Sequence, residues 1–202
     1  MSVGRLSTGA GLSAGALVVP VSPASVSVGS GSATVSGNGQ VSFSGASSIS
    51  INNCFTATYN NYRIIFNPTA SVGTDSSLNF RYRAGGSDIS TATYGSQRIV
   101  SFGTNTVSSA NLTGNTMHPL SLISATYADV YYSVIEVHNP FLSRKKVFRT
   151  DINSLGSGGP TFYLETHGGY NDTTTSFDGF SIFTGGTSIT GTIRVYGYAN
   201  GA

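Results

Sequence analysis

Charged residues are scarce in this chain. Of its 202 residues, 10 are Lys or Arg and 8 are Asp or Glu, which gives a charged fraction of 9% and a formal net charge of +2. About a quarter of the residues are charged in a typical soluble domain. A protein that binds nucleic acid needs a basic surface to contact phosphates. The composition therefore argues against nucleic acid as a partner.

Cysteine and long hydrophobic segments are also lacking. Cys54 is the single cysteine, so no disulfide can form within the chain. This fits a protein that folds in a reducing cytoplasm, and we expect Cys54 to be a small core residue rather than a nucleophile. No segment approaches the roughly 20 apolar residues of a membrane-spanning helix. We therefore expect no insertion into a membrane.

The sequence also lacks any segment in which apolar residues recur with the period of an α-helix. The 26 Gly, together with abundant Ser, Thr and Asn, favour turns and strands over long helices. The 11 Tyr and 11 Phe supply the apolar surface that disordered chains lack. Short runs instead alternate apolar and polar residues, as half-buried antiparallel strands do. This pattern predicts an all-β fold, an antiparallel β-sandwich of the jelly-roll type.

The expected strands follow one another from residue 49 onward. They lie at residues 49–52, 62–66, 78–83, 98–102, 130–138, 146–150, 162–165, 180–183 and 192–198. The run 62–66 should end at Asn67-Pro68, and the run 130–138 is apolar on both faces, which predicts a central strand. The residues that we expect to be buried are Ile64, Phe66, Phe80, Val134, Val137, Ile182, Ile193 and Val195.

The first 45 residues differ in composition from the rest. They contain one charged residue, Arg5, and no aromatic residue before Phe43. Alternating runs at 33–36 and 40–43 flank Gly37-Asn38-Gly39, which is a strong signal for a hairpin. We therefore expect residues 1–45 to be an N-terminal docking arm and hairpin, and residues 46–202 to be the β-sandwich domain.

The arm carries a short apolar strip that a partner could bind. Its members are Leu12, Leu17, Val18, Val19 and Val21. Two prolines in this region bias the chain toward extended conformations, and an extended strip can add to the edge of a neighbouring sheet. Ordering each residue costs about 1–2 kcal/mol of backbone entropy, which so little apolar surface cannot offset alone. We expect the arm, to about residue 30, to become ordered only against another subunit.

Four segments, taken in order, resemble structural proteins of tailed bacteriophages. They are residues 49–66, residues 78–83 with Gly85-Gly86 and Tyr94, residues 136–140 with Lys145-Lys146, and residues 189–197. Each is a strand pattern followed by a characteristic turn or connection. The similarity extends over residues 48–198.

This resemblance implies a non-enzymatic virion structural protein, made in the host bacterial cytoplasm. Its sandwich would project on the particle exterior, as in a tail fibre or tail tip, with the arm docked on other virion proteins. Sheets with few charges do little to keep copies apart, so we expect a homo-oligomer, with a trimer favoured by the resemblance. Two alternatives stay open, namely a capsid decoration or cement protein and a module that recognises a host surface glycan.

No motif for a cofactor or a metal stands out. His118, His138 and His167 have no metal-ligand spacing, and the chain has neither a P-loop nor a nucleophile elbow. The oxygen-bearing side chains Asn171, Asp172 and Asp178 do not match a calcium loop and are better interpreted as a polar loop. The sequence therefore predicts no cofactor and no metal.

Two further groups of residues have a functional and a structural interpretation. Asp151 and Glu165 could form the carboxylate pair of a glycoside hydrolase, but acidic residues are too few to favour an enzyme. The basic run at 144–146 could contact phosphate, although a solvated turn between strands is the preferred interpretation.

Three tyrosines are the candidate contacts for a glycan or a partner. Tyr94, Tyr127 and Tyr170 stand beside Gly, Asn and Thr residues in segments that look like loops. Aromatic faces next to hydroxyl and amide groups suit sugar stacking. The competing and preferred interpretation is that they pack at the ends of the sandwich or at a subunit contact.

Overall fold

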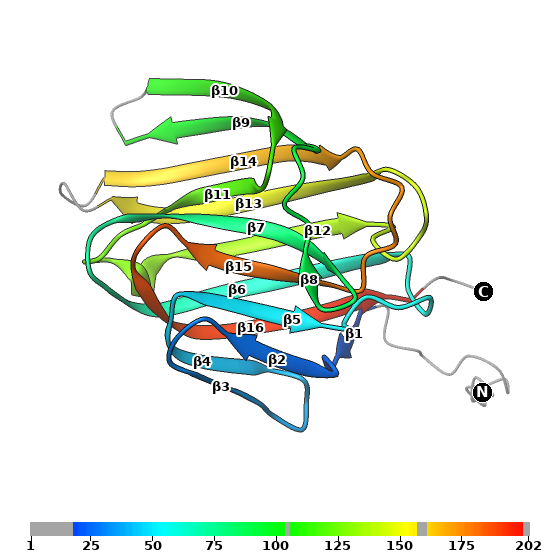
Figure 1. The fold of residues 1–202 in the computed structure, drawn as a ribbon. Coiled ribbons are helices and arrows are strands. Elements are labelled where there is room, and N and C mark those ends of the chain that lie inside the picture. The colour runs from blue at the N-terminus through cyan, green and yellow to red at the C-terminus, as the bar shows by residue number, and fades with distance from the viewer. Residues whose placement is uncertain (1–17, 104–105, 157–160, 200–202) are drawn as a thin grey trace, which may run out of the picture.

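The computed structural model describes residues 18–103, 106–156 and 161–199, and within these ranges the chain is almost entirely β-strand (Figure 1). The strands are β1 (Val18–Val21), β2 (Ser25–Val28), β3 (Ser32–Val35), β4 (Val41–Ala46), β5 (Ser48–Asn52), β6 (Asn61–Val72), β7 (Ser76–Ala84), β8 (Ser87–Asp88), β9 (Tyr94–Phe102), β10 (Thr106–Asn115), β11 (His118–Ile123), β12 (Tyr132–His138), β13 (Lys146–Gly156), β14 (Thr161–Asn171), β15 (Gly179–Thr184) and β16 (Ser188–Tyr198). One short 3-10 turn, η1 (Ala128–Val130), precedes β12.

The strands form two antiparallel sheets that face each other. The larger, of 10 strands, has the order β10-β9-β14-β13-β12-β6-β16-β4-β3, with β1 also paired to β16. The smaller, of 6 strands, has the order β11-β7-β15-β5-β2, with β8 beside β7. This confirms the predicted antiparallel sandwich.

The alternation of side chains explains why these segments form half-buried strands. In β16, Ile189, Gly191, Ile193 and Val195 are buried, while the residues at the positions in between are half-buried and face outward. Successive side chains in a strand point to opposite faces, so a period of two places one set in the core. Burying each large aliphatic side chain contributes about 1.5–3 kcal/mol.

Stacked aromatic rings fill the space between the sheets. Phe180 of β15 lies with its ring centroid 5.7 Å from that of Phe55 and 5.6 Å from that of Phe80. Phe177 stacks on Tyr82 at 4.5 Å. Cys54 is fully buried in this core, as expected for a small apolar residue, and burial raises the pKa of its thiol.

Seven of the eight residues predicted to be buried are buried, but the prediction for Val134 was wrong. Tyr131, Ser133, Ile135 and Val137 face the core, whereas Val134 is only half-buried on the outer face of the large sheet. β12 lies centrally within that sheet, between β13 and β6. The prediction assumed that a central strand is covered on both faces. Among the described residues, no second sheet covers the outer face of the large sheet, so Val134 is only half-buried.

The N-terminal segments depart in part from the expected arm. The hairpin is confirmed, since β3 pairs with β4 and Val35 lies opposite Val41. However, β1 pairs with β16 and β2 pairs with β5, so residues 18–28 belong to the sheets of their own chain rather than to an arm held by another subunit. The expectation of an arm rested on the low content of apolar and aromatic residues. It did not consider that the valines of residues 18–28 are enough for short strands that pair with other strands of the same chain.

β6 is longer than its sequence pattern predicts. It continues through Pro68 to Val72 instead of ending at Asn67-Pro68. A register shift against β16 between Thr190 and Gly191 lies opposite this proline. Proline cannot donate a ladder hydrogen bond, and an irregularity in the pairing accommodates it.

The large sheet extends past the small one. Figure 1 shows β9 and β10 beyond β11, the last strand of the small sheet. We call β9, β10 and residues 162–165 of β14 the overhang. β10 and β11 were not predicted. The sequence of β10 is rich in Ser, Thr and Asn and resembles a loop, whereas β11 is a short run with a proline at its second position.

Candidate functional site

A groove forms where the overhang leaves the cover of the small sheet. Its volume is about 290 Å³. The inner face of the large sheet is the floor and β11 forms a wall. The lining residues are Asp75, Arg98, Val100, Ser121, Leu122, Ser124, Ser154, Leu155, Gly156, Tyr163 and Glu165. Polar groups thus gather where the cover of the small sheet ends.

Glu165 is the buried acid of this groove. Its side chain is only 5% exposed although it lies on β14 at the groove floor. Ser121 of β11 donates a hydrogen bond to one carboxylate oxygen, and His167 Nε2 lies 3.1 Å from the other. A buried carboxylate needs such partners, because desolvation without them is costly. Ser121 thereby ties the small sheet to the floor of the large one.

Two histidines lie behind Glu165, on the core side. The ring of His118 in β11 lies edge-on to that of His167, with centroids 5.5 Å apart, and contacts Phe148 at 4.1 Å. Both histidines are 1% exposed. Burial first, and then the nearby His167, lower the pKa of His118 well below its ordinary value. His118 is therefore a neutral packing residue at neutral pH.

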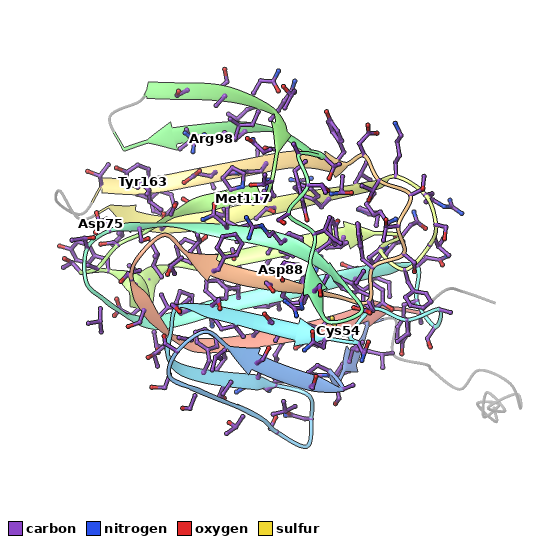
Figure 2. The ribbon with its side chains drawn as sticks, in the orientation of Figure 1. Cys54, Asp75, Asp88, Arg98, Met117 and Tyr163 are labelled. Atoms are coloured by element: carbon purple, nitrogen blue, oxygen red, sulfur yellow. The ribbon has the colours of Figure 1, made fainter. Side chains whose placement is uncertain are left out.

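Arg98 of β9 and Tyr163 of β14, both labelled in Figure 2, also line the groove. Arg98 of β9 lies 3.9 Å from the Glu165 carboxylate, and 42% of its side chain is exposed. At that distance the two groups form an ion pair and not a hydrogen bond. Tyr163 of β14 covers Gly156, where a Cβ atom would lie 2.5 Å from the ring. The glycine therefore allows the tyrosine ring to lie flat on the sheet.

Asp75 adds a second carboxylate at the rim. It is exposed, in the connection from β6 to β7, and accepts a hydrogen bond of 2.9 Å from the backbone N–H of Ala125. Figure 2 places Asp75 and Tyr163 at the same end of the molecule. The groove thus offers two carboxylates, one guanidinium, several hydroxyl groups and one aromatic ring.

The three predicted tyrosines do not come together. Tyr94 is 1% exposed, and its hydroxyl accepts from Tyr82 N at 2.9 Å and donates to Ile89 O at 3.0 Å. Tyr94 is therefore a core residue, and its prediction as a glycan contact was wrong. Tyr127 is half-buried before η1, and Tyr170 is exposed on the outer face, where it covers Gly95.

The carboxylate pair considered for hydrolysis is not formed. Asp151 lies opposite Thr166 in the pairing of β13 with β14, whereas Glu165 lies opposite Ile152. Adjacent positions point to opposite faces of the sheet, so Asp151 is on the outer face and Glu165 on the inner one. On the outer face, Asp151 accepts hydrogen bonds from Arg149 and Thr166.

The polar residues considered for calcium also have separate partners. Asp172 pairs with Lys145, and Asp178 accepts from the backbone N–H of Gly85 at 2.8 Å. Asn171 accepts from the Thr173 hydroxyl at 2.7 Å. Over the described residues, no group of three or more His, Cys, Asp or Glu side chains could hold a metal ion. No helix in this part of the chain is long and apolar enough to cross a membrane.

The basic run at 144–146 is only partly the solvated turn that we expected. Lys145 is exposed, but Lys146 is completely buried at the start of β13. Its ammonium group donates to the carbonyl oxygens of Arg144 and Thr175 and lies 4.6 Å from the Phe177 ring centroid. Burial and the neighbouring Arg144 lower its pKa to about 8. Its role is to close one end of the core.

Apolar side chains gather on the outer face of the overhang. We call this group the outer strip, and its members are Ile99, Val107, Phe162 and Leu164. Each is at least half exposed, with Val107 the most exposed at 67%. β10, beside the strip, is the free edge of the large sheet and has no charged residue or proline. Edge strands are ordinarily protected by such residues, so this edge is open to pairing.

The predicted docking strip of the arm is divided by the structure. Val18, Val19 and Val21 lie in β1, half-buried or exposed against the edge of β16. Leu12 and Leu17 lie outside the described residues. The three valines are therefore occupied by their own chain and are not a free docking segment.

Comparison with known proteins gave no relative by sequence. No family model matches the chain, and no curated protein matches it. Domain 4 of an extracellular arabinanase from Geobacillus stearothermophilus, in complex with arabinotriose, is 8% identical, with 91% of this chain and 82% of that chain covered and a TM-score of 0.27. The laminarinase catalytic domain from Thermotoga maritima, in complex with cetyltrimethylammonium bromide, is 12% identical, with coverages of 91% and 78% and a TM-score of 0.23. Likenesses this weak carry no argument about function.

Sequence reasoning considered one residue of the groove, Glu165, but only as a possible partner of Asp151 in an enzyme that it did not favour. The groove joins β9, β11 and β14, and the hydrogen bond from Ser121 to Glu165 spans 44 positions. The strand expected at 162–165 contains Tyr163, but the sequence does not say which face of that strand is the inner one.

Proposed function

We propose that this chain is a non-enzymatic structural protein of a bacteriophage virion, made in the bacterial cytoplasm and displayed on the particle exterior. In this proposal, copies of the chain associate through the outer strip and contact other virion proteins. The observation that carries it is the exposed apolar surface on the overhang, beside an unprotected sheet edge. The ordered resemblance of residues 48–198 to tailed-phage structural proteins supports the same role.

The physical case for self-association rests on exposure and charge. Fully burying a side chain such as Leu164 or Phe162 is worth about 1.5–3 kcal/mol, so the four residues together favour a covered state. The occupant is a second copy of this chain. The outer strip and β10 contain no charged residue. Contact between two copies through this surface would therefore break no ion pair and bring no like charges together. A trimer, as the phage resemblance implies, would bring three strips to one axis.

The positions of Asp151 and Glu165 argue against the hydrolytic pair that the sequence offered. Hydrolysis of a glycoside needs two carboxylates on either side of the scissile bond. The pair that the sequence offered, Asp151 and Glu165, lies on opposite faces of the large sheet. Glu165 is also engaged by Ser121 and His167, which suits a structural or binding group.

Sedimentation velocity on the purified full chain tests the proposal. We expect a stable trimer for the wild type and a monomer for Ile99→Ser/Leu164→Ser, with an unchanged far-UV spectrum. Val72→Ser is the matched control, since Val72 is 70% exposed but lies away from the strip on β6. A wild-type protein that is monomeric and folded at micromolar concentration would overturn the self-association role.

A further inference from the structure

We propose that the groove beneath the overhang is a binding site for one ring of a neutral saccharide. The proposal goes beyond assembly, because it uses the inner face of β14 and not the outer strip. A volume of about 290 Å³ lies near the lower end of ligand pockets, which run from roughly 300 to 1,000 Å³. The groove therefore suits a ligand of monosaccharide size, or the terminal ring of a longer chain.

Tyr163 supplies the stacking surface. Its ring lies over Gly156, and any larger residue there would meet the ring at 2.5 Å. The C–H face of a sugar ring packs on such an aromatic face, while the phenol hydroxyl remains polar. The glycine fixes the ring before the ligand arrives, so less conformational entropy is lost on binding.

Glu165, Arg98 and Asp75 supply the directional contacts. Carboxylate oxygens accept hydrogen bonds from sugar hydroxyl groups, and a guanidinium donates to them. Across the described residues, the Arg98 guanidinium donates no hydrogen bond within the chain, and its contact with Glu165 is an ion pair at 3.9 Å. Ser121 and His167 hold the Glu165 carboxylate in place, so its orientation is set before binding.

The charges of the groove indicate a neutral ligand. Glu165 and Asp75 both line the groove together with the cation Arg98, and the other polar side chains of the lining carry serine and tyrosine hydroxyl groups. An acidic sugar would place its carboxylate against Glu165 and Asp75, where like charges repel. Neutral hexoses and pentoses should therefore bind in preference to sialic or uronic acids. Affinity for a single ring in so open a groove should be millimolar.

The position of the groove allows binding while the protein is assembled. Tyr163 and Glu165 face inward from β14, whereas Phe162 and Leu164 of the outer strip face the other way. A saccharide in the groove and a second copy on the strip therefore occupy opposite faces of one strand. Loss of one interaction should leave the other intact.

Saturation-transfer NMR on the full chain provides the test. The probes are methyl glycosides of glucose, galactose, mannose, N-acetylglucosamine and arabinose, with sialic acid as the acidic comparison. We expect saturation transfer to at least one neutral glycoside and none to sialic acid. Tyr163→Ala and Arg98→Ala should each weaken binding at least tenfold.

Two control variants match those changes on the opposite face. Tyr170→Ala and Arg149→Ala remove the same side-chain types from exposed positions on β14 and β13, and both should bind like the wild type. Arg98 and Arg149 are both well exposed, so their comparison holds even if Tyr163→Ala does not fold. Absence of any neutral binder, equal binding by Arg98→Ala, or a preference for sialic acid would each overturn the assignment.

Discussion

The covered and uncovered parts of the large sheet are built from the same kind of strand but are stabilised differently. Where β12, β6 and β16 face the small sheet, their inner side chains pack against stacked aromatic rings such as Phe180 and Phe80. Where β9 and β14 pass the edge strand β11, the inner face carries Arg98, Glu165 and His167. The covered middle of the sheet thus buries apolar residues, whereas the edge of the small sheet buries paired polar groups, beside which Arg98 is exposed in the groove.

The outer face shows the reverse distribution along the same sheet. Toward the middle, Arg63 pairs with Glu136 at 2.6 Å, so this region is polar and solvated. On the overhang, large apolar residues are exposed instead. The overhang thus presents an apolar surface on one side and a polar groove on the other. This difference from the covered region is the reason that we place both proposed functions there.

The largest expected effect separates the covered core from the overhang. Phe180→Ala should lower the free energy of unfolding by about 3–5 kcal/mol, because a buried aromatic ring is lost and a cavity remains. Phe162→Ser, on the half-exposed ring of the outer strip, should change that free energy by less than about 0.5 kcal/mol when measured on monomer. Urea denaturation at equal protein concentration compares them. Similar losses for the two variants would mean that the overhang has a core of its own.

A second effect concerns the buried ammonium group at the end of the core. The pKa of Lys146 is about 8 in the folded chain, below its ordinary 10.5. Between these values the unfolded chain binds a proton that the folded chain has released, so stability should rise with pH, by at most about 3 kcal/mol in total. Lys146→Met should abolish this rise in urea denaturation from pH 8 to 10.5. The same rise in the variant would assign it to another group.

The hydroxyl group of Tyr94 offers a smaller and more local test. It accepts from Tyr82 N and donates to Ile89 O, so Tyr94→Phe leaves a buried N–H without its partner. We expect a loss of about 1–3 kcal/mol in the free energy of unfolding. Tyr170→Phe, at an exposed position, is the control and should be neutral. Equal stability of Tyr94→Phe would argue that water replaces the hydroxyl and that Tyr94 is accessible after all.

The smallest effect should appear in acid, at the boundary between the two regions. His118 is neutral in the folded chain, since burial lowers its pKa from the ordinary 6.5. Below that value the unfolded chain gains the proton first, so stability should fall with decreasing pH, by at most about 1.4 kcal/mol for each pH unit. Thermal unfolding of His118→Met should show a weaker dependence on pH than the wild type. An unchanged dependence would assign the fall in stability to another group.

The strands of the covered region could be predicted because burial on one face imposes a period of two. β7 and β16 show it plainly, with Leu78, Phe80 and Tyr82 or Ile193 and Val195 at alternate positions. The overhang lacks that constraint. β10 is composed mostly of small polar residues, since neither of its faces enters the core, and its sequence could not be distinguished from a loop.

The groove could not be predicted for a different reason. Ser121 and Glu165 come together only through the packing of two sheets, and Tyr163 faces inward only because of the register of β14. Neither fact has a local signal in the sequence. Residues 18–28 show a related limit. Their sequence has only a weak strand pattern, and they form strands because they pair with β16 and β5.

A cryo-EM map of the phage particle that we propose contains this chain tests the central claim most directly. We predict that the sandwich projects on the particle exterior, with the outer strip buried between copies and the groove open to solvent. Particles that lack the chain, or that display it with Ile99 and Leu164 exposed to solvent, would contradict the proposal.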